Sequence, residues 1–283
     1  MISCADIRGD VIRRHYDIST LFYRLLWGRH IHHGLWEQDD TSARVTPAQA
    51  AQQLTEELAR LVGIQEADRV IDVGCGMGGS SIHLARAHRC QVTGITISPF
   101  QRHWATWSSR LAGTRQRTQF LCQDAEHVRL ADQSADIVWS IECTEHLFGK
   151  PEFFRRAAGW LRPGGRMAIC AWLAADDPLT RSQEQQVYDV CEGFFCPSLG
   201  SAQDYSNWMT AAGLQMKHVA DWTVRVRRTW EICRDRINRF GIRRMASWID
   251  PGQIIFLDRF QTLLDAYNSG AMKYGCFIAE KPE

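Results

Sequence analysis

A glycine loop between an apolar run and a helical pattern is the first place in the sequence where chemistry is expected. Residues 70–79 read Val-Ile-Asp-Val-Gly-Cys-Gly-Met-Gly-Gly. Glycine lets the backbone approach a ligand closely, and a helix N-terminus offers unpaired N–H groups to an anionic group. Gly74, Gly76 and Gly78 are therefore the expected backbone contacts of a cofactor. By itself, such a loop also fits a structural turn or a dinucleotide site.

Polar residues at the ends of three expected strands narrow the choice of cofactor. Asp72 stands just before the loop, where a carboxylate can orient the loop amides and receive an ammonium group. The second strand ends with the hydroxyls of Thr96 and Ser98, where an enzyme that binds a dinucleotide usually carries an acid for the ribose. Asp124 follows the third strand and can accept from an adenine amino group, while the N–H of Ala125 serves a ring nitrogen. Together these positions favour S-adenosylmethionine.

Two carboxyl groups and an imidazole follow the fourth expected strand. Glu142, Glu145 and His146 come directly after the apolar run 135–141, and ligands of open parallel sheets bind at the carboxyl ends of the strands. A carboxylate at Glu142 could accept a proton from a carbocation or a phenol, or stabilise a developing positive charge. The structural alternatives are that Glu142 holds loop backbone and that His146 packs or caps its helix.

The elements that must position these residues form an alternating pattern. Short apolar runs alternate with helical patterns, which predicts βαβ units and a parallel sheet. The expected strands are 69–73, 91–96, 118–122, 135–141, 165–171, 214–226 and 273–280, with a helix stop and turn at 161–165 and a helical insertion at 230–267. We expect an α/β, Rossmann-like fold: a mostly parallel seven-stranded sheet with helices on both faces and a helical cap. Residues 1–46 would form the N-terminal cap, 47–175 the cofactor-binding core, and 176–283 the rest of the sheet with a substrate lid.

Composition and charge exclude several classes of partner. The chain has 33 basic and 32 acidic residues and a net charge of +1, so no global field draws it to nucleic acid. Every apolar run is shorter than 18 residues, so no membrane insertion is expected. Ten scattered cysteines without a C-x-x-C pair or a signal peptide favour reduced thiols and a cytoplasmic location.

Several motifs resemble one family of enzymes. The glycine loop, the run 94–99 with Gln101, and the run 140–146 are similar to class I S-adenosylmethionine-dependent methyltransferases of the γ-tocopherol methyltransferase group. That group includes bacterial C-methyltransferases of terpenoids and, more distantly, cyclopropane fatty acid synthases. The resemblance extends from His15-Tyr16-Asp17 through 32–36 to Tyr274-Gly275, which is nearly the whole chain. It implies that Thr96 and Gln101 hold the ribose and methionine parts of the cofactor.

The resemblance also implies a role for the aromatic N-terminal segment. It places this segment over the active site, with Tyr16 above the sulfonium or the substrate, where its π face can stabilise a cation. Plain core packing is the alternative. The spacing His30-x-His32-His33 could suggest a metal, but no neighbouring Asp, Glu or Cys completes a ligand set, so no metal is expected.

The acceptor is indicated only by class. Eleven tryptophans suit the bulky apolar walls of a site for a flat or greasy molecule. Residues 224–230 carry several arginines where the family resemblance predicts a more apolar run, and residues 224–244 hold eight arginines in all. They could grip a diphosphate or form a solvated helix face.

Three classes of function stay open. The favoured hypothesis is methylation of an isoprenoid, indole or phenolic acceptor at carbon, in specialised metabolism and with a carbocation intermediate. Methylation at N or O is its nearest alternative. An oxidoreductase binding NAD or FAD is opposed by the missing acid at Thr96, and a non-catalytic cofactor-binding protein is the third. The N-terminal segment could also pack on a neighbouring subunit, which favours a homo-oligomer.

Overall fold

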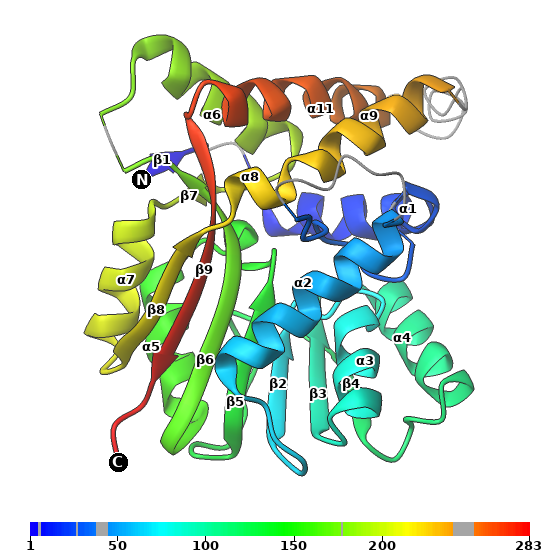
Figure 1. Ribbon diagram of the computed structural model, residues 1–283, viewed down its shortest axis with the longest axis vertical. Helices are drawn as coiled ribbons and strands as arrows, with labels where there is room; N and C mark the ends of the chain where they lie inside the picture. The colour runs from blue at the N-terminus through cyan, green and yellow to red at the C-terminus, as the bar shows by residue number, and fades with distance from the viewer. Residues whose placement is uncertain (5–6, 27, 38–44, 177, 240–251) are drawn as a thin grey trace.

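The computed structural model describes residues 1–4, 7–26, 28–37, 45–176, 178–239 and 252–283. Its centre is a seven-stranded sheet in the order β4-β3-β2-β5-β6-β9-β8 (Figure 1). The strands from β4 to β6 run parallel, and β9 is antiparallel to both of its neighbours. The strands are β2 (Arg69–Val73), β3 (Gln91–Thr96), β4 (Thr118–Cys122), β5 (Ala135–Ile141), β6 (Leu161–Ala174), β8 (Gln215–Asp221) and β9 (Met272–Glu280). The predicted mostly parallel α/β sheet is confirmed.

The first four predicted strands have the observed bounds, and the later ones differ. The predicted turn at 161–165 lies inside β6, where Gly164 has a φ of +69° and the pairing with β5 shifts register. The turn residues therefore produce a bulge, and the ladder continues on both sides of it. The predicted strand 214–226 ends at Asp221. The carboxylate of Asp221 accepts the N–H of Thr223 at 2.8 Å and starts the short helix α8 (Thr223–Val226).

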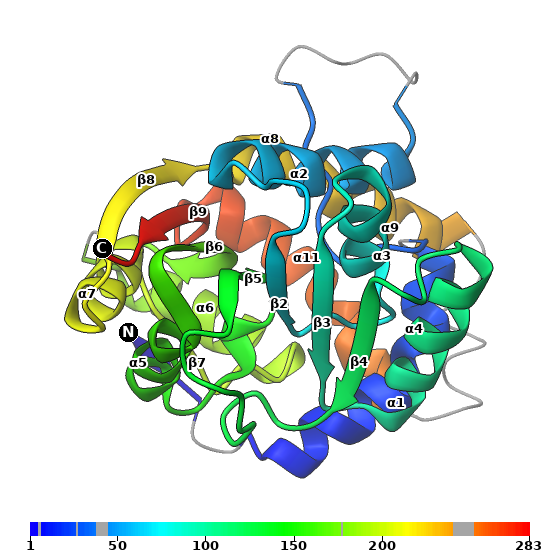
Figure 2. The same ribbon diagram turned by 90° about the horizontal axis from the view of Figure 1, so that it is seen from below.

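Helices cover both faces of the sheet because both faces are apolar. Successive side chains of a strand point to opposite faces. Val70 of β2 packs in one core cluster with Leu54 of α2 (Pro47–Val62), whereas Ile71 packs in a second cluster with Phe153 of α5 (Lys150–Trp160). Figure 2 shows α2 and α3 (Gly79–Ala87) on one side, and α5 and α7 (Ala202–Ala211) on the other.

A cap of helices lies over the carboxyl ends of the parallel strands. Figure 1 shows α1, α6, α9 and α11 gathered there, above the sheet. They are α1 (Gly9–Leu26), α6 (Arg181–Gly193), α9 (Arg228–Arg239) and α11 (Gly252–Asn268). The predicted insertion 230–267 corresponds to α9 and α11, and its part at 240–251 lies outside the described residues. Near the cap, β1 (Ile2–Ser3) pairs with β7 (Ser198–Leu199).

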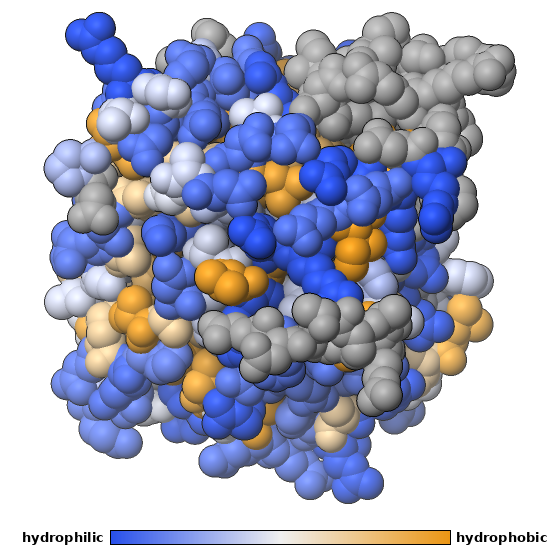
Figure 3. Space-filling view, turned by 45° about the horizontal axis from the view of Figure 1, so that its top comes forward, coloured by the Kyte–Doolittle hydropathy of each residue, from blue (hydrophilic) through white to orange (hydrophobic). Residues whose placement is uncertain are grey.

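The outer surface is polar over much of its extent. In Figure 3 the hydrophobic residues of the visible face form small separate groups among hydrophilic ones. None of the helices in the described part of the chain is long and apolar enough to cross a membrane. All ten cysteines are free thiols, and most are buried.

Candidate active site

Three adjoining chambers lie between the sheet and the cap. The loop chamber, about 340 Å³, is lined by residues that include Arg29, His32, Asp72, Gly74, Gly76 and Ser80. The large chamber, about 820 Å³, is lined by residues that include Tyr16, Thr96, Gln101, Asp124, Ala125 and Glu142. The aromatic chamber, about 460 Å³, is lined by residues that include Tyr16, His32, Glu145, Trp172, Phe194 and Trp230.

The chambers share walls. Ile31 lines all three, and Gly74 and Gly76 line both the loop chamber and the large chamber. Tyr16 and Glu142 line both the large chamber and the aromatic chamber, as does His146. The structure therefore brings most of the predicted site residues to the walls of three adjoining chambers.

The three predicted loop glycines have different roles. Gly76, with a φ of +52°, has nothing within 4 Å of where a Cβ would stand, so the backbone there is open to the chambers. Gly74 has a φ of +76°, and a Cβ on it would collide with Cys143. Gly78 starts α3 with a φ of +80° and packs against Ala105 and Phe120. Gly78 is not among the residues that line the three chambers, and its contact with a cofactor stays a prediction.

Asp72 lies buried at the wall of the loop chamber. Its Oδ2 accepts the Ser81 hydroxyl at 2.5 Å. Burial raises the pKa of Asp72 to about 6, although the Ser81 hydrogen bond opposes this shift. A ligand ammonium beside this carboxylate would favour the ionised form, which suits the predicted contact with the methionine part of the cofactor.

Polar residues after β3 are linked to each other and to α1. The Thr96 hydroxyl donates to Gln101 Oε1 at 2.9 Å, and Gln101 Nε2 donates to the Thr20 hydroxyl at 3.2 Å. Ser98 caps α4 (Pro99–Leu111) and donates to Asp17 Oδ1 at 2.5 Å. Thr96 and Gln101 line the large chamber, whereas Ser98 is fully buried and is not among its lining residues. The proposed cofactor contact of Ser98 has no support from its position.

Asp124 and Ala125 lie at the wall of the large chamber, after β4. Asp124 Oδ1 accepts the N–H of Glu126 at 2.8 Å, and Oδ2 lies 3.0 Å from Nδ1 of His127. The carboxylate is thus fixed by its own turn. It holds a position at which an adenine amino group could approach it from the chamber.

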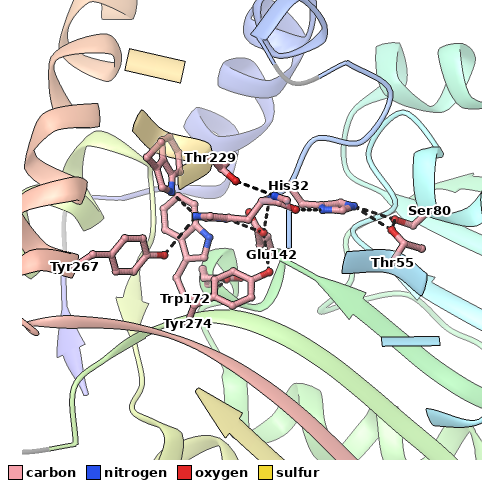
Figure 4. Close-up of polar contacts among 12 residues, drawn as sticks. His32, Thr55, Ser80, Glu142, Trp172, Thr229, Tyr267 and Tyr274 are labelled. Carbon is pink, nitrogen blue, oxygen red and sulfur yellow. Dashed lines mark hydrogen bonds and ion pairs between the residues drawn. The ribbon is translucent and has the colours of Figure 1, made fainter. Parts of the chain in front are cut away.

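Glu142 is held as an ionised carboxylate at the junction of the large and aromatic chambers. Its Oε1 accepts the backbone N–H of His33 at 2.8 Å and the hydroxyl of Tyr274 at 2.8 Å (Figure 4). Burial alone would raise its pKa, but the neighbouring imidazoles of His33 and His32 outweigh burial, and the pKa of Glu142 is lowered. No residue in the described part of the chain donates to Oε2. That oxygen is available to a substrate.

His33 is a functional candidate that sequence reasoning did not identify. Its Nδ1 lies 2.9 Å from Glu142 Oε1, although the N–H is not aligned well enough for a hydrogen bond. The indole N–H of Trp230 donates to His33 Nε2, and an indole nitrogen can only donate. Because Nε2 accepts this bond, the ring N–H of His33 is on Nδ1, beside Glu142. The sequence feature that could have pointed to His33 is the triplet His30-x-His32-His33, which the sequence analysis interprets only as a possible metal motif.

His32 orients the same segment. Its Nδ1 lies 2.8 Å from the His33 carbonyl, so this nitrogen carries the proton and donates. Its Nε2 lies 3.3 Å from the Ser80 hydroxyl and 3.4 Å from the Thr55 hydroxyl (Figure 4). Both ring nitrogens thus have partners within the protein.

Tyr16 and His146 form a second pair. The carbonyl of Phe195 lies 3.0 Å from His146 Nδ1 and can only accept, so Nδ1 is protonated and Nε2 accepts from the Tyr16 hydroxyl at 2.7 Å. Burial lowers the pKa of His146 to about 4, so its ring is neutral at pH 7. His146 thereby fixes Tyr16 at the junction of the large and aromatic chambers.

Three rings form the wall of the aromatic chamber. Trp172, Phe194 and Trp230 pack edge to face, with centroids 5.2 to 5.6 Å apart. Glu145 lies against them, and its Oε1 accepts the backbone N–H of Trp172 at 2.5 Å. Burial raises the pKa of Glu145 to about 8. The chamber thus combines apolar walls with one ionised carboxylate, Glu142, and one neutral carboxyl.

The other tryptophans and the arginine-rich stretch lie elsewhere. Trp107 is 55% exposed on α4, Trp222 is buried in the core, and Trp248 lies outside the described residues. The described arginines of 224–239 are absent from the lining of the three chambers. They contact other groups, as Arg227 contacts Glu231 and Arg228 contacts the ring of Trp36.

The sheet order, the glycine loop, Asp72 near the end of β2 and Asp124 after β4 define a class I methyltransferase fold. The chain is an S-adenosylmethionine-dependent methyltransferase. It belongs to the family described as mycolic acid cyclopropane synthetase, which matches residues 6–247. S-Adenosylmethionine is the cofactor and supplies an electrophilic methyl group. The predicted kinship with the tocopherol methyltransferase group is confirmed by sequence relatives, and a terpenoid C-methyltransferase shares the fold.

Similar proteins include two sequence relatives and one solved structure. Tocopherol O-methyltransferase of Arabidopsis thaliana is 29% identical over 96% of this chain and 82% of that protein. The 27-O-demethylrifamycin SV methyltransferase of Amycolatopsis mediterranei is 32% identical over 96% of this chain and 97% of that protein. The geranyl diphosphate C-methyltransferase of Streptomyces coelicolor A3(2) superimposes with a TM-score of 0.75, at 18% identity, over 96% of this chain and 97% of that one.

Proposed function

We propose that the protein methylates a carbon atom of an uncharged isoprenoid, indole or phenolic acceptor that binds in the aromatic chamber. The observation that carries this proposal is the position of Glu142. Its carboxylate lies where the large chamber meets the aromatic chamber, and Oε2 is left to a substrate.

The residues around the loop and large chambers fit the cofactor. The open backbone at Gly76 and the buried carboxylate of Asp72 suit the methionine part. Thr96 and Gln101 are assigned to the ribose and methionine parts, and Asp124 to the adenine. Methyl transfer is an in-line displacement, so the protein contributes mainly alignment and the exclusion of water.

Glu142 is assigned as the base that accepts the proton lost by the methyl acceptor. A carbon that gains a methyl group from a phenol, an indole or an alkene passes through a cation, which must lose a proton. An ionised carboxylate can take that proton, and the π faces of Tyr16 and the chamber rings can stabilise the cation. This use of Glu142 requires no ionisable group other than the carboxylate itself.

The walls of the aromatic chamber favour an uncharged acceptor. The geranyl diphosphate C-methyltransferase takes an isoprenoid diphosphate by its name. In this chain, the described arginines of 224–239 do not line the chamber, and its wall is formed mainly by rings. A diphosphate would need cationic partners to offset the free-energy cost of removing it from water.

Methylation of a hydroxyl oxygen is the second candidate function. One of the similar proteins is named an O-methyltransferase and another is named for an O-demethylated substrate. Glu142 could equally take the proton of a hydroxyl group. The assignment of Glu142 as the base is common to both reactions.

Two measurements test the proposal. Calorimetry should show micromolar binding of S-adenosylhomocysteine and no binding of NAD, with weaker binding to Asp72→Ala. The protein should then be incubated with methyl-¹³C-labelled S-adenosylmethionine and a panel of terpenes, indoles and phenols, with isoprenoid diphosphates and sugars included for comparison. The ¹³C chemical shift of the transferred methyl group, measured by NMR, shows whether the group is bound to carbon, oxygen or nitrogen. Transfer only to charged or sugar acceptors would contradict the proposal.

A further inference from the structure

Two side chains that line the aromatic chamber each carry a buried polar atom with no hydrogen-bond partner among the described residues. These atoms are Oε2 of Glu145 and the indole Nε1 of Trp172. The side chains are 1% and 8% exposed, respectively. Buried polar groups in native proteins are nearly always satisfied, so two exceptions on one chamber wall require an explanation. A ligand in the chamber supplies one.

Both atoms can act as donors. An indole nitrogen has no acceptor capacity. Glu145 Oε1 already accepts the Trp172 backbone N–H, which leaves Oε2 as the position for the carboxyl proton. Burial and the neighbouring charge of Glu142 keep Glu145 neutral. The opposing charge of Lys150 is engaged elsewhere, because its Nζ donates to the Leu147 carbonyl at 2.7 Å and the Ser198 hydroxyl at 2.9 Å.

The two side chains are held on adjoining parts of the wall. Glu145 belongs to the 3-10 turn Thr144–His146 after β5, and Trp172 lies near the end of β6, paired in register with Tyr274 of β9. The bond between Glu145 Oε1 and the Trp172 backbone ties the carboxyl group to that residue. Figure 4 shows Trp172 and Tyr267 to the left of Glu142 and the ring of Tyr274 below it.

We propose that Glu145 and Trp172 donate hydrogen bonds to an oxygen atom of the methyl acceptor, which is therefore an oxygenated molecule such as a phenol, an enol or a terpenoid alcohol or ketone. This inference rests on the proposed function, because it places the acceptor in the aromatic chamber. It narrows the acceptor class by excluding pure hydrocarbons. It also gives the two carboxyl groups different roles: ionised Glu142 takes a proton, and neutral Glu145 orients the substrate.

Binding of two closely related ligands tests the inference without turnover. The probes are p-cresol and toluene, which differ by one hydroxyl group, titrated by ligand-observed NMR against protein saturated with S-adenosylhomocysteine. A site built to hydrogen-bond a hydroxyl group discriminates strongly against the analogue that lacks it. Wild type should bind p-cresol at least about tenfold more tightly than toluene. Equal affinity, or failure of p-cresol to bind, would overturn the inference.

Three variants identify the donors. Trp172→Phe keeps an aromatic ring and removes only the N–H, so p-cresol should bind about five- to tenfold more weakly while toluene is unaffected. Glu145→Gln keeps an acceptor for Trp172 and an N–H donor for the chamber, so it should retain p-cresol affinity, whereas Glu145→Met should lose it. Equal losses for both probes in Trp172→Phe would contradict the proposal. If Glu145→Met fails to fold, the affinities of Trp172→Phe and Glu145→Gln for the two probes still test the proposal.

Trp139 offers a matched control. Its indole Nε1 is also buried and unpartnered among the described residues, but Trp139 is not a lining residue of the three chambers. Trp139→Phe should therefore leave both affinities unchanged. If wild type does not bind S-adenosylhomocysteine, the result counts against the proposed function. If wild type binds S-adenosylhomocysteine but has equal affinity for p-cresol and toluene, the result counts against this inference alone.

Discussion

Oε1 of Glu142 lies 2.9 Å from Nδ1 of His33, although the two residues are 109 positions apart in the chain. The backbone N–H of His33 donates to the same oxygen at 2.8 Å. The N-terminal segment therefore fixes the carboxylate of the core, and it keeps that carboxylate ionised. The ionisation of Glu142, the proposed base, therefore depends on how the N-terminal segment is packed against it.

Removing the carboxylate of Glu142 should abolish most of the activity and leave cofactor binding intact. Glu142→Gln keeps the size of the side chain but cannot take a proton, and loss of a general base costs about 10²- to 10⁴-fold in rate. Single-turnover kinetics and calorimetry with S-adenosylhomocysteine measure the two effects. Glu152→Gln, on the exposed face of α5, is the control. A Glu142→Gln enzyme with wild-type turnover would remove Glu142 from the mechanism.

Replacing His33 should shift the pH profile of catalysis. His33 is among the groups that lower the pKa of Glu142 against the effect of burial. In His33→Gln the pKa of Glu142 should rise, so the carboxylate is protonated sooner as the pH falls. The acid limb of kcat/KM should then move upward by about one pH unit. An unshifted limb with a uniformly lower rate would mean that His33 only supports the fold.

Affinity for S-adenosylhomocysteine should fall in acid. Asp72 has a pKa raised to about 6 by burial, and pairing with the ligand ammonium requires its ionised form. Below that pH, binding must first remove a proton, so the dissociation constant should rise by up to about tenfold per pH unit. Titrations between pH 5 and 8 measure this effect. Asp72→Asn should bind weakly with little pH dependence, and a flat wild-type curve would argue against the contact.

Two loop glycines should respond differently to alanine. At Gly74 the new methyl group would collide with Cys143 in a backbone region unfavourable for alanine, which should lower the free energy of unfolding by about 2–4 kcal/mol. At Gly76 the space is open, so only the cost of the positive φ, about 1–2 kcal/mol, is expected. Gly76→Ala should instead weaken S-adenosylhomocysteine binding. Denaturant unfolding and calorimetry separate the outcomes, and the reverse pattern would contradict the assignment.

Local patterns predicted the core better than they predicted the site. The bounds of β2 to β5 follow from apolar runs with clear turn signals, and the residues around Gly74, Gly76, Asp124 and Glu142 follow from their place after those strands. The turn at 161–165 was wrong as a strand boundary, because neighbouring strands kept β6 extended through the bulge at Gly164. Tertiary pairing outweighed turn propensity there.

The partners of Glu142 could not be predicted from the sequence. His33 is fixed by Trp230 and lies 3.4 Å from the hydroxyl of Tyr267, and both partners come from the C-terminal insertion. Only packing of the cap brings these distant segments together, and a pattern of local periodicity carries no information about it. The sequence also did not reveal that the Ser98 hydroxyl caps α4, and the cofactor contact of Ser98 stays a prediction.

Part of the wall of the aromatic chamber comes from a later segment of the chain than the proposed cofactor contacts, which bears on how enzymes of this kind diversify. Asp72, Gly76, Thr96 and Asp124 all lie between β2 and β5, whereas Trp172, Phe194 and Trp230 come from later in the chain. Mutations in the later segment can reshape the acceptor pocket while the methyl-donor site is inherited unchanged. Selection for a new acceptor can therefore act on one half of the reaction at a time. Exchange of the later segment between relatives would be a route to new acceptors in the laboratory as well.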